Sequence, residues 1–207
     1  MPGFEATIAA IDAANAADPR QDNGAPFETV YAQRMSACLD ALYPDASELL
    51  KIAARAQHLR RWEIARSDYP EGRKGYNDWR HACRDHHARQ VGDIMRAQGY
   101  DDDAIAHVGG LIRKAQLKKD PESQALENVA AVVFLEYYFN DFLKKYADYA
   151  DDKIVDILGK TLCKMSPRGH AAALALPLDA RARALVAAAV TREAAALERL
   201  AAVACDT

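Results

Sequence analysis

The sequence predicts an all-α protein, a single-domain helical bundle of about eight or nine helices. Alanine is abundant along its 207 residues, β-branched residues are sparse, and apolar residues recur every three or four positions instead of alternating. A chain of this length is long enough to bury one core. We expect the helical domain to span residues 1–176, and an Ala-rich helix over 177–207 to pack on it or to serve in oligomerisation.

In the first half of the chain, proline, glycine and polar residues separate the expected helices. These run over about 4–18, 27–42, 45–66, 76–98 and 103–118. Asp45 or Ser47 can cap the third helix after Pro44, and Gly99 ends the fourth as a C′ glycine would. Residues 19–26 are expected to form a polar loop, and residues 67–75 a break that reverses the chain.

In the second half, the expected helices run over about 121–146, 152–165, 167–177 and 178–204. Pro121 suits the first turn of a long helix, because proline has a fixed φ and needs no partner for an amide hydrogen. Asp151 and Asp152 suit the positive amino end of the next. We find no internal repeat, so the chain is not expected to be a solenoid.

Charge and composition exclude several classes of protein. The formal net charge is −3, so there is no global basic field for nonspecific nucleic-acid binding. Its four cysteines are scattered, which argues against a zinc ribbon or a disulfide framework. There is no basic region before an amino-terminal apolar run and no long uncharged stretch. We therefore expect a cytoplasmic monomer or homodimer without a membrane partner.

Residues 56–87 concentrate histidine, arginine, tryptophan and tyrosine in this Ala-rich chain. If residues 45–66 are one helix, His58, Arg61, Trp62 and Arg66 share a face of it. Two antiparallel helices would then direct both polar stripes to one groove. The expected substrate-binding residues are Arg61, Trp62, Arg66, Tyr69, Arg73, Tyr76, Trp79, Arg80 and Lys114.

The chemistry of this expected groove favours a small anionic molecule. Guanidinium groups present paired donors in fixed geometry and keep their proton, so they suit phosphate or carboxylate. The alternative is structural, because arginines on helices are commonly solvated and tryptophans commonly belong to the core. RNA would use similar aromatic and cationic side chains, but an acidic chain disfavours it without excluding it.

Three residues are the candidates for catalysis and for binding one divalent metal ion: His58, His87 and Glu127. The expected helix hairpin would bring the two histidines close, and neutral imidazole is a common metal ligand. Glu127 lies inside an apolar run, where a carboxylate is costly unless it is paired or bound to metal. An ion pair of Glu127 with Arg61, Arg80 or Lys114 is the competing interpretation.

Several motifs together resemble an uncharacterised family of bacterial and fungal proteins known as a domain of unknown function. They are R-A-Q-H-L-R-R-W at 55–62, Y-P-x-G-R-x-G-Y at 69–76, L-E-N at 126–128 and K-T-L-C-K-M-S at 160–166. The resemblance covers about residues 4–176, and Asn128 stands where the family pattern has aspartate. Some members are labelled glutamyl-tRNA synthetase-like, but this chain lacks the length and the α/β pattern of a synthetase.

A more distant likeness is to HD-domain metallohydrolases. The segment L-K-I-A-A-R-A-Q-H-L at 50–59 is similar to their metal-binding helix, with Gln57 and His58 at the positions of the His-Asp pair. This resemblance implies an HD-like fold, one bound metal ion in a rearranged site, and hydrolysis of a phosphate ester.

Two functions therefore remain as hypotheses. One is an HD-like enzyme that acts on a small phosphorylated or carboxylated substrate, held by arginines and processed by His58 or His87 as general acid or base. The other is a noncatalytic module that binds an anionic metabolite, a protein carboxylate or RNA through the same residues. A third interpretation assigns the work to the tail helix as a contact for a partner.

Overall fold

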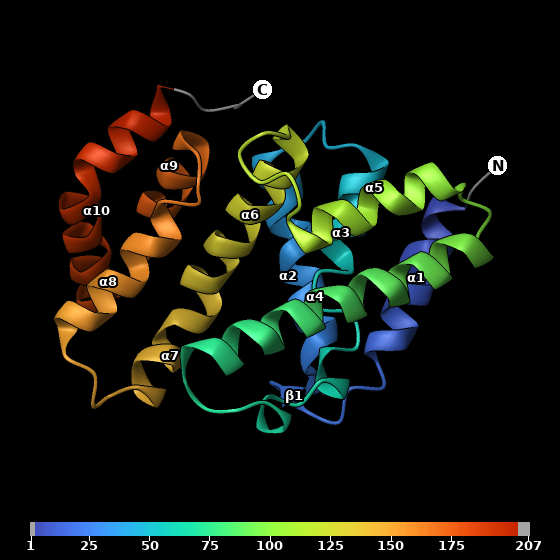
Figure 1. The fold of residues 1–207 in the computed structure, drawn as a ribbon, viewed down its shortest axis with the longest axis horizontal. Coiled ribbons are helices and arrows are strands. Elements are labelled where there is room, and N and C mark those ends of the chain that lie inside the picture. The colour runs from blue at the N-terminus through green and yellow to red at the C-terminus, as the bar shows by residue number, and fades with distance from the viewer. Residues whose placement is uncertain (1–2, 203–207) are drawn as a thin grey trace. The chain divides into compact units, whose positions relative to one another are not determined.

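A computed structural model describes residues 3–202 of the chain, and this part is all-helical as predicted (Figure 1). Its ten α-helices are α1 (Phe4–Asn15), α2 (Phe27–Leu42), α3 (Glu48–Arg55), α4 (Gly72–Ala97), α5 (Asp102–Arg113), α6 (Pro121–Val133), α7 (Phe139–Lys145), α8 (Asp151–Leu162), α9 (Pro167–Ala175) and α10 (Ala180–Ala201). Two 3₁₀ turns are η1 (Arg61–Glu63) and η2 (Arg66–Asp68). The expected helix over 121–146 is divided by a π-helical turn, η3 (Phe134–Tyr138), so the described chain has one helix more than expected.

The chain forms two compact units, residues 3–116 and residues 117–202 of the described part. The first contains α1 to α5 and the second contains α6 to α10. No helix within residues 3–202 has the length and apolar character needed to cross a membrane.

In the first unit, α4 packs along α5, and α3 packs against both α2 and α5. The core that holds them contains fully buried apolar side chains from each helix, including Ile11, Met35, Leu39, Ile52 and Met95. Burial of such side chains is the main stabilising contribution, about 1.5–3 kcal/mol for each. Gly99 has a φ of 85° directly after α4, which confirms its predicted place beyond the helix end.

The predicted helix over 45–66 is wrong in its second half. The side chain of Ser47 caps α3 by accepting a hydrogen bond from the Leu50 amide at 3.1 Å, but the helix ends at Arg55. Residues 56–60 form turns, and Arg60 has a φ of 53°. His58, Arg61, Trp62 and Arg66 therefore do not share the face of one helix.

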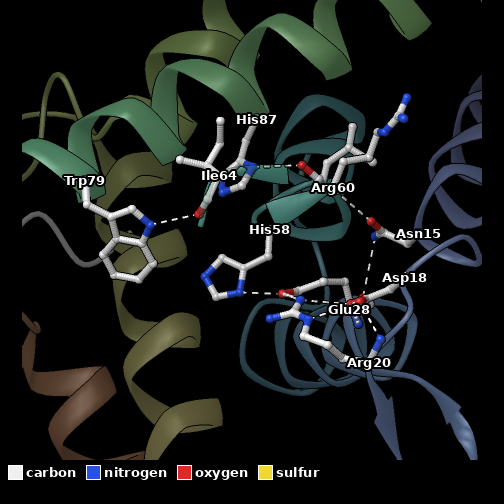
Figure 2. Close-up of polar contacts among 10 residues, drawn as sticks. Asn15, Asp18, Arg20, Glu28, His58, Arg60, Ile64, Trp79 and His87 are labelled. Atoms are coloured by element: carbon white, nitrogen blue, oxygen red, sulfur yellow. Dashed lines mark hydrogen bonds and ion pairs between the residues drawn. The ribbon is translucent and has the colours of Figure 1, made fainter. Parts of the chain in front are cut away.

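Long-range hydrogen bonds stabilise this segment as a turn instead of a helix. Oδ1 of Asn15, at the end of α1, accepts the Arg60 amide at 3.1 Å. Nδ1 of His87, on α4, lies 2.8 Å from the Leu59 carbonyl oxygen. Nε1 of Trp79 donates to the Ile64 carbonyl at 2.9 Å, as Figure 2 shows for all three contacts. These partners satisfy backbone groups that a continued helix would have satisfied within itself.

The expected loop at 19–26 contains a small hairpin. Strand β1 (Gln21–Asp22) pairs antiparallel with β2 (Ala25–Pro26). Asn23 and Gly24 connect them with φ values of 51° and 82°, as a two-residue type I′ turn requires. Asn-Gly is the sequence signal that predicts such a turn, and it fixes where α2 begins.

Gly75 allows α4 to begin at Gly72 instead of at the expected Tyr76. A Cβ atom at Gly75 would lie 1.9 Å from the Pro70 carbonyl oxygen, so the preceding loop would have to move. We expect Gly75→Ala to lower the free energy of unfolding by about 2 kcal/mol or more, measured by urea denaturation.

Gly110→Ala is the matched control for this substitution. Gly110 lies inside α5 and a Cβ there would meet nothing within 4 Å. The alanine should stabilise the helix by about 0.5–1 kcal/mol. Equal effects of the two substitutions would contradict the steric role of Gly75.

In the second unit, α6 packs on α9 and α8 packs on α10. Asp120 caps α6 through a 2.7 Å hydrogen bond from the Ser123 amide. Asn128, which is fully buried, accepts the Ser166 amide at 3.0 Å and so ties α6 to the start of α9. The tail helix α10 buries one apolar face and thus packs within this unit. Cys205 and the end of the tail lie outside the described residues.

Candidate functional site

The candidate site is a cluster of polar side chains in the first unit, which we call the histidine cluster: Glu28, Tyr31, His58, Cys83 and His87. Helix α2 supplies Glu28 and Tyr31, the turn after α3 supplies His58, and α4 supplies Cys83 and His87. The rings of Tyr31 and His58 stack with centroids 3.9 Å apart and planes 10° apart. The His87 ring lies 5.9 Å from that of His58 (Figure 2).

Glu28 is held in place from the hairpin side of the cluster. Its Oε1 accepts a 2.7 Å hydrogen bond from Arg20, which also donates to both carboxylate oxygens of Asp18. Asp18 in turn accepts the Glu28 amide at 3.1 Å. The Glu28 side chain is fully buried, and this burial raises its carboxyl pKa, while Arg20 opposes the shift. Arg20 thus determines which way the carboxylate faces.

The second oxygen of Glu28 faces the imidazole of His58. Oε2 of Glu28 and Nδ1 of His58 lie 3.4 Å apart, and both atoms are buried without a hydrogen bond of good geometry within the described chain. The His58 side chain nevertheless keeps 24% of its area exposed. Because Nδ1 is covered, the exposed area belongs to the rest of the ring, which leaves the edge opposite Nδ1 accessible.

His58 is a neutral imidazole at neutral pH. Burial lowers its pKa well below the usual value, and the positive charges of Arg61, Lys114, Arg80 and Arg20 lower it further. A neutral imidazole with one nitrogen beside a carboxylate and the opposite edge accessible has the arrangement of a general base.

His87 is also neutral and is almost completely buried. Burial lowers its pKa well below the usual value, and His58 and Arg61 contribute in the same direction. A carbonyl oxygen can only accept, so Nδ1 carries the hydrogen that is donated to Leu59. Nε2 then has a free lone pair, and no hydrogen bond within residues 3–202 satisfies it.

Two arginines beside the cluster have aromatic supports and no acidic partner. The Arg61 guanidinium lies 4.6 Å from the ring centroid of Trp79, and that of Arg80 lies 5.8 Å from the Tyr76 ring. Neither arginine forms an ion pair with any carboxylate of the described chain. The charge of Arg61 acts on the Glu28 carboxylate, whose pKa it lowers, but neither guanidinium is tied up in an ion pair of the described chain.

Cys83 is buried between these groups and is not activated. Burial raises the pKa of its thiol, and this effect exceeds the opposing effects of Arg61 and Arg80. The pKa of the Cys163 thiol is also raised, by burial and by Glu193. Neither cysteine is a candidate nucleophile.

The structure brings together only part of the predicted set. His58, His87, Arg61 and Arg80 gather as expected, and the charge of Lys114 reaches His58. Trp79 supports the site through its contacts with Arg61 and Ile64.

Within residues 3–202, no hydrogen bond, ion pair or ring contact joins Trp62, Arg66 or Arg73 to the histidine cluster. Arg66 donates to the carbonyls of Tyr69 and Pro70 at 2.8 and 3.1 Å, so it braces its own loop. Arg73 is exposed, and Trp62 is half-buried. Glu127 is buried on α6 in the second unit, so its grouping with the two histidines stays a prediction.

The carboxylate that faces His58 was not predicted. Glu28 lies in the first turn of α2, where an acidic residue is ordinary because it favours the helix amino terminus. Tyr31 lies one turn later in α2, at a spacing that is typical of a core residue. No local motif distinguishes either residue, and only the packing of the turn 56–60 on α2 reveals them.

Comparison with known protein families identifies one that matches most of the chain. A family model described as a domain of unknown function, DUF4202, matches residues 5–186. No curated protein and no solved structure matches the chain. The matched region includes the whole histidine cluster and most of the described chain. The resemblance stated from the sequence motifs is confirmed at this level, and the chain therefore belongs to the DUF4202 family.

Proposed function

We propose that the first unit carries the acid–base site of an enzyme that acts on a small anionic substrate, either phosphorylated or carboxylated. One observation carries this proposal: Arg61 and Arg80, which form no ion pair in the described chain, place positive charge near a neutral His58 that is backed by Glu28. Arginines in purely structural positions usually have a carboxylate or carbonyl partner.

Arg61 and Arg80 would bind the anionic group of the substrate. Each guanidinium leaves its hydrogen-bonding edge available while an aromatic ring supports its face. The charge-assisted hydrogen bonds that they offer are stronger than neutral ones and match the oxygens of phosphate or carboxylate.

His58 would act as the general base. The accessible edge of its ring takes a proton from a water molecule or a substrate hydroxyl, and Glu28 stabilises the imidazolium that forms. Binding of the anion favours this step, because it offsets the positive charges that lower the His58 pKa. Substrate binding thus makes His58 a stronger base at the moment when it is needed.

The finer form of the proposal is metal-dependent hydrolysis on an HD-like fold, with His58, His87 and Glu127 as ligands. Within residues 3–202, no three histidine, cysteine, aspartate or glutamate side chains are grouped as a metal site requires. We therefore derive no step through a metal ion, and the acid–base step above uses only side chains of the first unit.

A noncatalytic module that binds an anionic metabolite is the second candidate. The same two arginines favour it, since guanidinium groups outside ion pairs explain anion binding without any chemical step. Absence of turnover together with phosphate binding would select this candidate over the enzyme.

The anion site is tested by isothermal titration calorimetry with inorganic phosphate. We expect the double variant Arg61→Gln/Arg80→Gln to lose about 100-fold or more in affinity, because each charge-assisted contact contributes about 1.5–3 kcal/mol. The double variant Arg96→Gln/Arg113→Gln is the control, since it removes the same charge from exposed arginines that pair with Asp93 and Asp85.

The outcome of this comparison is decisive for the anion site. Affinity lost in the first double variant and kept in the control supports it, with circular dichroism to show that both are folded. Equal affinity in the two double variants, or no phosphate binding by the wild-type protein, would overturn it.

A further inference from the structure

His87 presents a buried hydrogen-bond acceptor without a donor in the described chain. The residue is 1% exposed, and Nδ1 is committed to the Leu59 carbonyl at 2.8 Å. Nε2 is therefore the acceptor of a neutral ring, and it has no partner within residues 3–202. A buried acceptor without a hydrogen-bond donor costs about 1–3 kcal/mol of stability, so the unpaired Nε2 needs an explanation.

The surroundings of His87 supply no donor to this atom. His86 meets its ring edge-on at 5.8 Å, and its own Nε2 lies 3.2 Å from a carboxylate oxygen of Glu63. His58 lies 5.9 Å away and directs Nδ1 to Glu28 instead. Figure 2 shows the His87 ring above that of His58, with one nitrogen on a dashed line and the second on the other side of the ring.

The acceptor lies beside the proposed anion site. The His87 ring lies 5.9 Å from the ring of His58, which is partly exposed, so a ligand that contacts His58 would lie close to His87 as well. Because Nε2 is buried, a ligand group would have to enter the cluster beside His58 to reach it. Such a group must donate a hydrogen bond, since the nitrogen offers only a lone pair.

We infer that the anionic ligand is hydroxylated, and that a hydroxyl group near its anionic end donates to Nε2 of His87. This inference rests on the proposed anion site and specifies its ligand class as polyol phosphates or hydroxy acids. His87 is then a specificity-determining residue, because an analogue that lacks the hydroxyl leaves the buried nitrogen unpaired.

The test compares two phosphate esters of equal charge by calorimetry: glycerol 3-phosphate and propyl phosphate. We expect the wild-type protein to bind glycerol 3-phosphate about 10-fold or more tightly, the effect of pairing one buried acceptor. Propyl phosphate should bind like inorganic phosphate, through the arginines alone.

Two variants of His87 separate its two nitrogens. Asparagine places its amide near the position of Nδ1 and can still donate to Leu59, whereas glutamine places its amide near the position of Nε2. We expect His87→Asn to bind both esters equally. His87→Gln should retain part of the preference, and thermal unfolding of each variant shows that it is folded.

Each outcome supports or overturns the inference. Equal binding of the two esters by the wild-type protein would leave the anion site standing and overturn the hydroxyl contact, as would a preference that persists in His87→Asn. Failure of the wild-type protein to bind either ester or inorganic phosphate would overturn both proposals.

Discussion

Replacing His58 by glutamine is expected to lower kcat by about 100- to 10,000-fold for the phosphate or carboxylate ester that the wild-type protein cleaves from a small panel. The proposed base takes up the proton at the accessible edge of its ring, and glutamine has no basic nitrogen. The substrate KM should change little, because the arginines that bind the anion remain. Release of inorganic phosphate or of the alcohol measures the rate.

His81→Gln is the control for this substitution, since His81 is an exposed histidine on the same helix as His87. It should keep the wild-type rate. A His58→Gln protein that is folded and retains its kcat would contradict the assignment of His58 as the base.

Glu28 acts through His58 and is a positioning residue. Glu28→Gln should lower kcat by a smaller factor, about 10-fold, while binding of inorganic phosphate stays unchanged.

The pH profile of kcat/KM tests the effect of Arg61 on His58. Removing the charge of Arg61 raises the pKa of His58, so the acidic limb of kcat/KM should move to higher pH in Arg61→Gln.

Acid is expected to destabilise the protein below pH 6.5, and the slope should approach about 3 kcal/mol per pH unit once the pH is about one unit lower. In the folded state the pKa values of His58 and His87 lie well below 6.5, whereas in the unfolded state both return to that value. The unfolded state therefore binds more protons in this range, and stability falls with pH. Each histidine contributes about 1.4 kcal/mol per unit until the pH reaches its folded pKa.

Protonation of Glu28 has the opposite effect on stability over part of this pH range. Its pKa is raised from 4.5 in the folded protein, so its protonation favours folding as the pH falls through the raised value. The slope should consequently grow as the pH falls below 6.5 and should lessen once Glu28 becomes protonated in the folded state. Urea denaturation between pH 7.5 and pH 5 measures it.

Variants assign this slope to the buried histidines. His58→Gln and His87→Asn should each reduce it by about 1.4 kcal/mol per pH unit, because each removes one group that must be protonated on unfolding. His86, whose pKa is also lowered by burial, adds to the slope in both variants. His81→Gln should leave the slope as in the wild-type protein, since that side chain is exposed. A slope that does not respond to either buried substitution would show that other groups cause the acid lability.

Local sequence determined the helices and most of their ends. Helix α2 has the predicted bounds, Phe27–Leu42, and Ser47 and Gly99 have their predicted places at helix ends. These features depend on apolar spacing and on the conformational preference of single residues, which are local properties. The arginines and histidines of residues 56–87 were also recognisable by type, and the prediction of an anionic ligand depends on those types alone.

Only the tertiary structure decided how those residues meet. The turn over 56–60 exists because two residues that are far away in sequence, Asn15 and His87, form hydrogen bonds with its backbone amide and carbonyl groups. In a continued α3 these groups would have bonded within the helix. The same turn places His58 on Glu28 and Tyr31 of α2. Hydrogen bonds between distant segments leave no periodic pattern in the sequence, so the identity of the carboxylate behind His58 depends on packing alone.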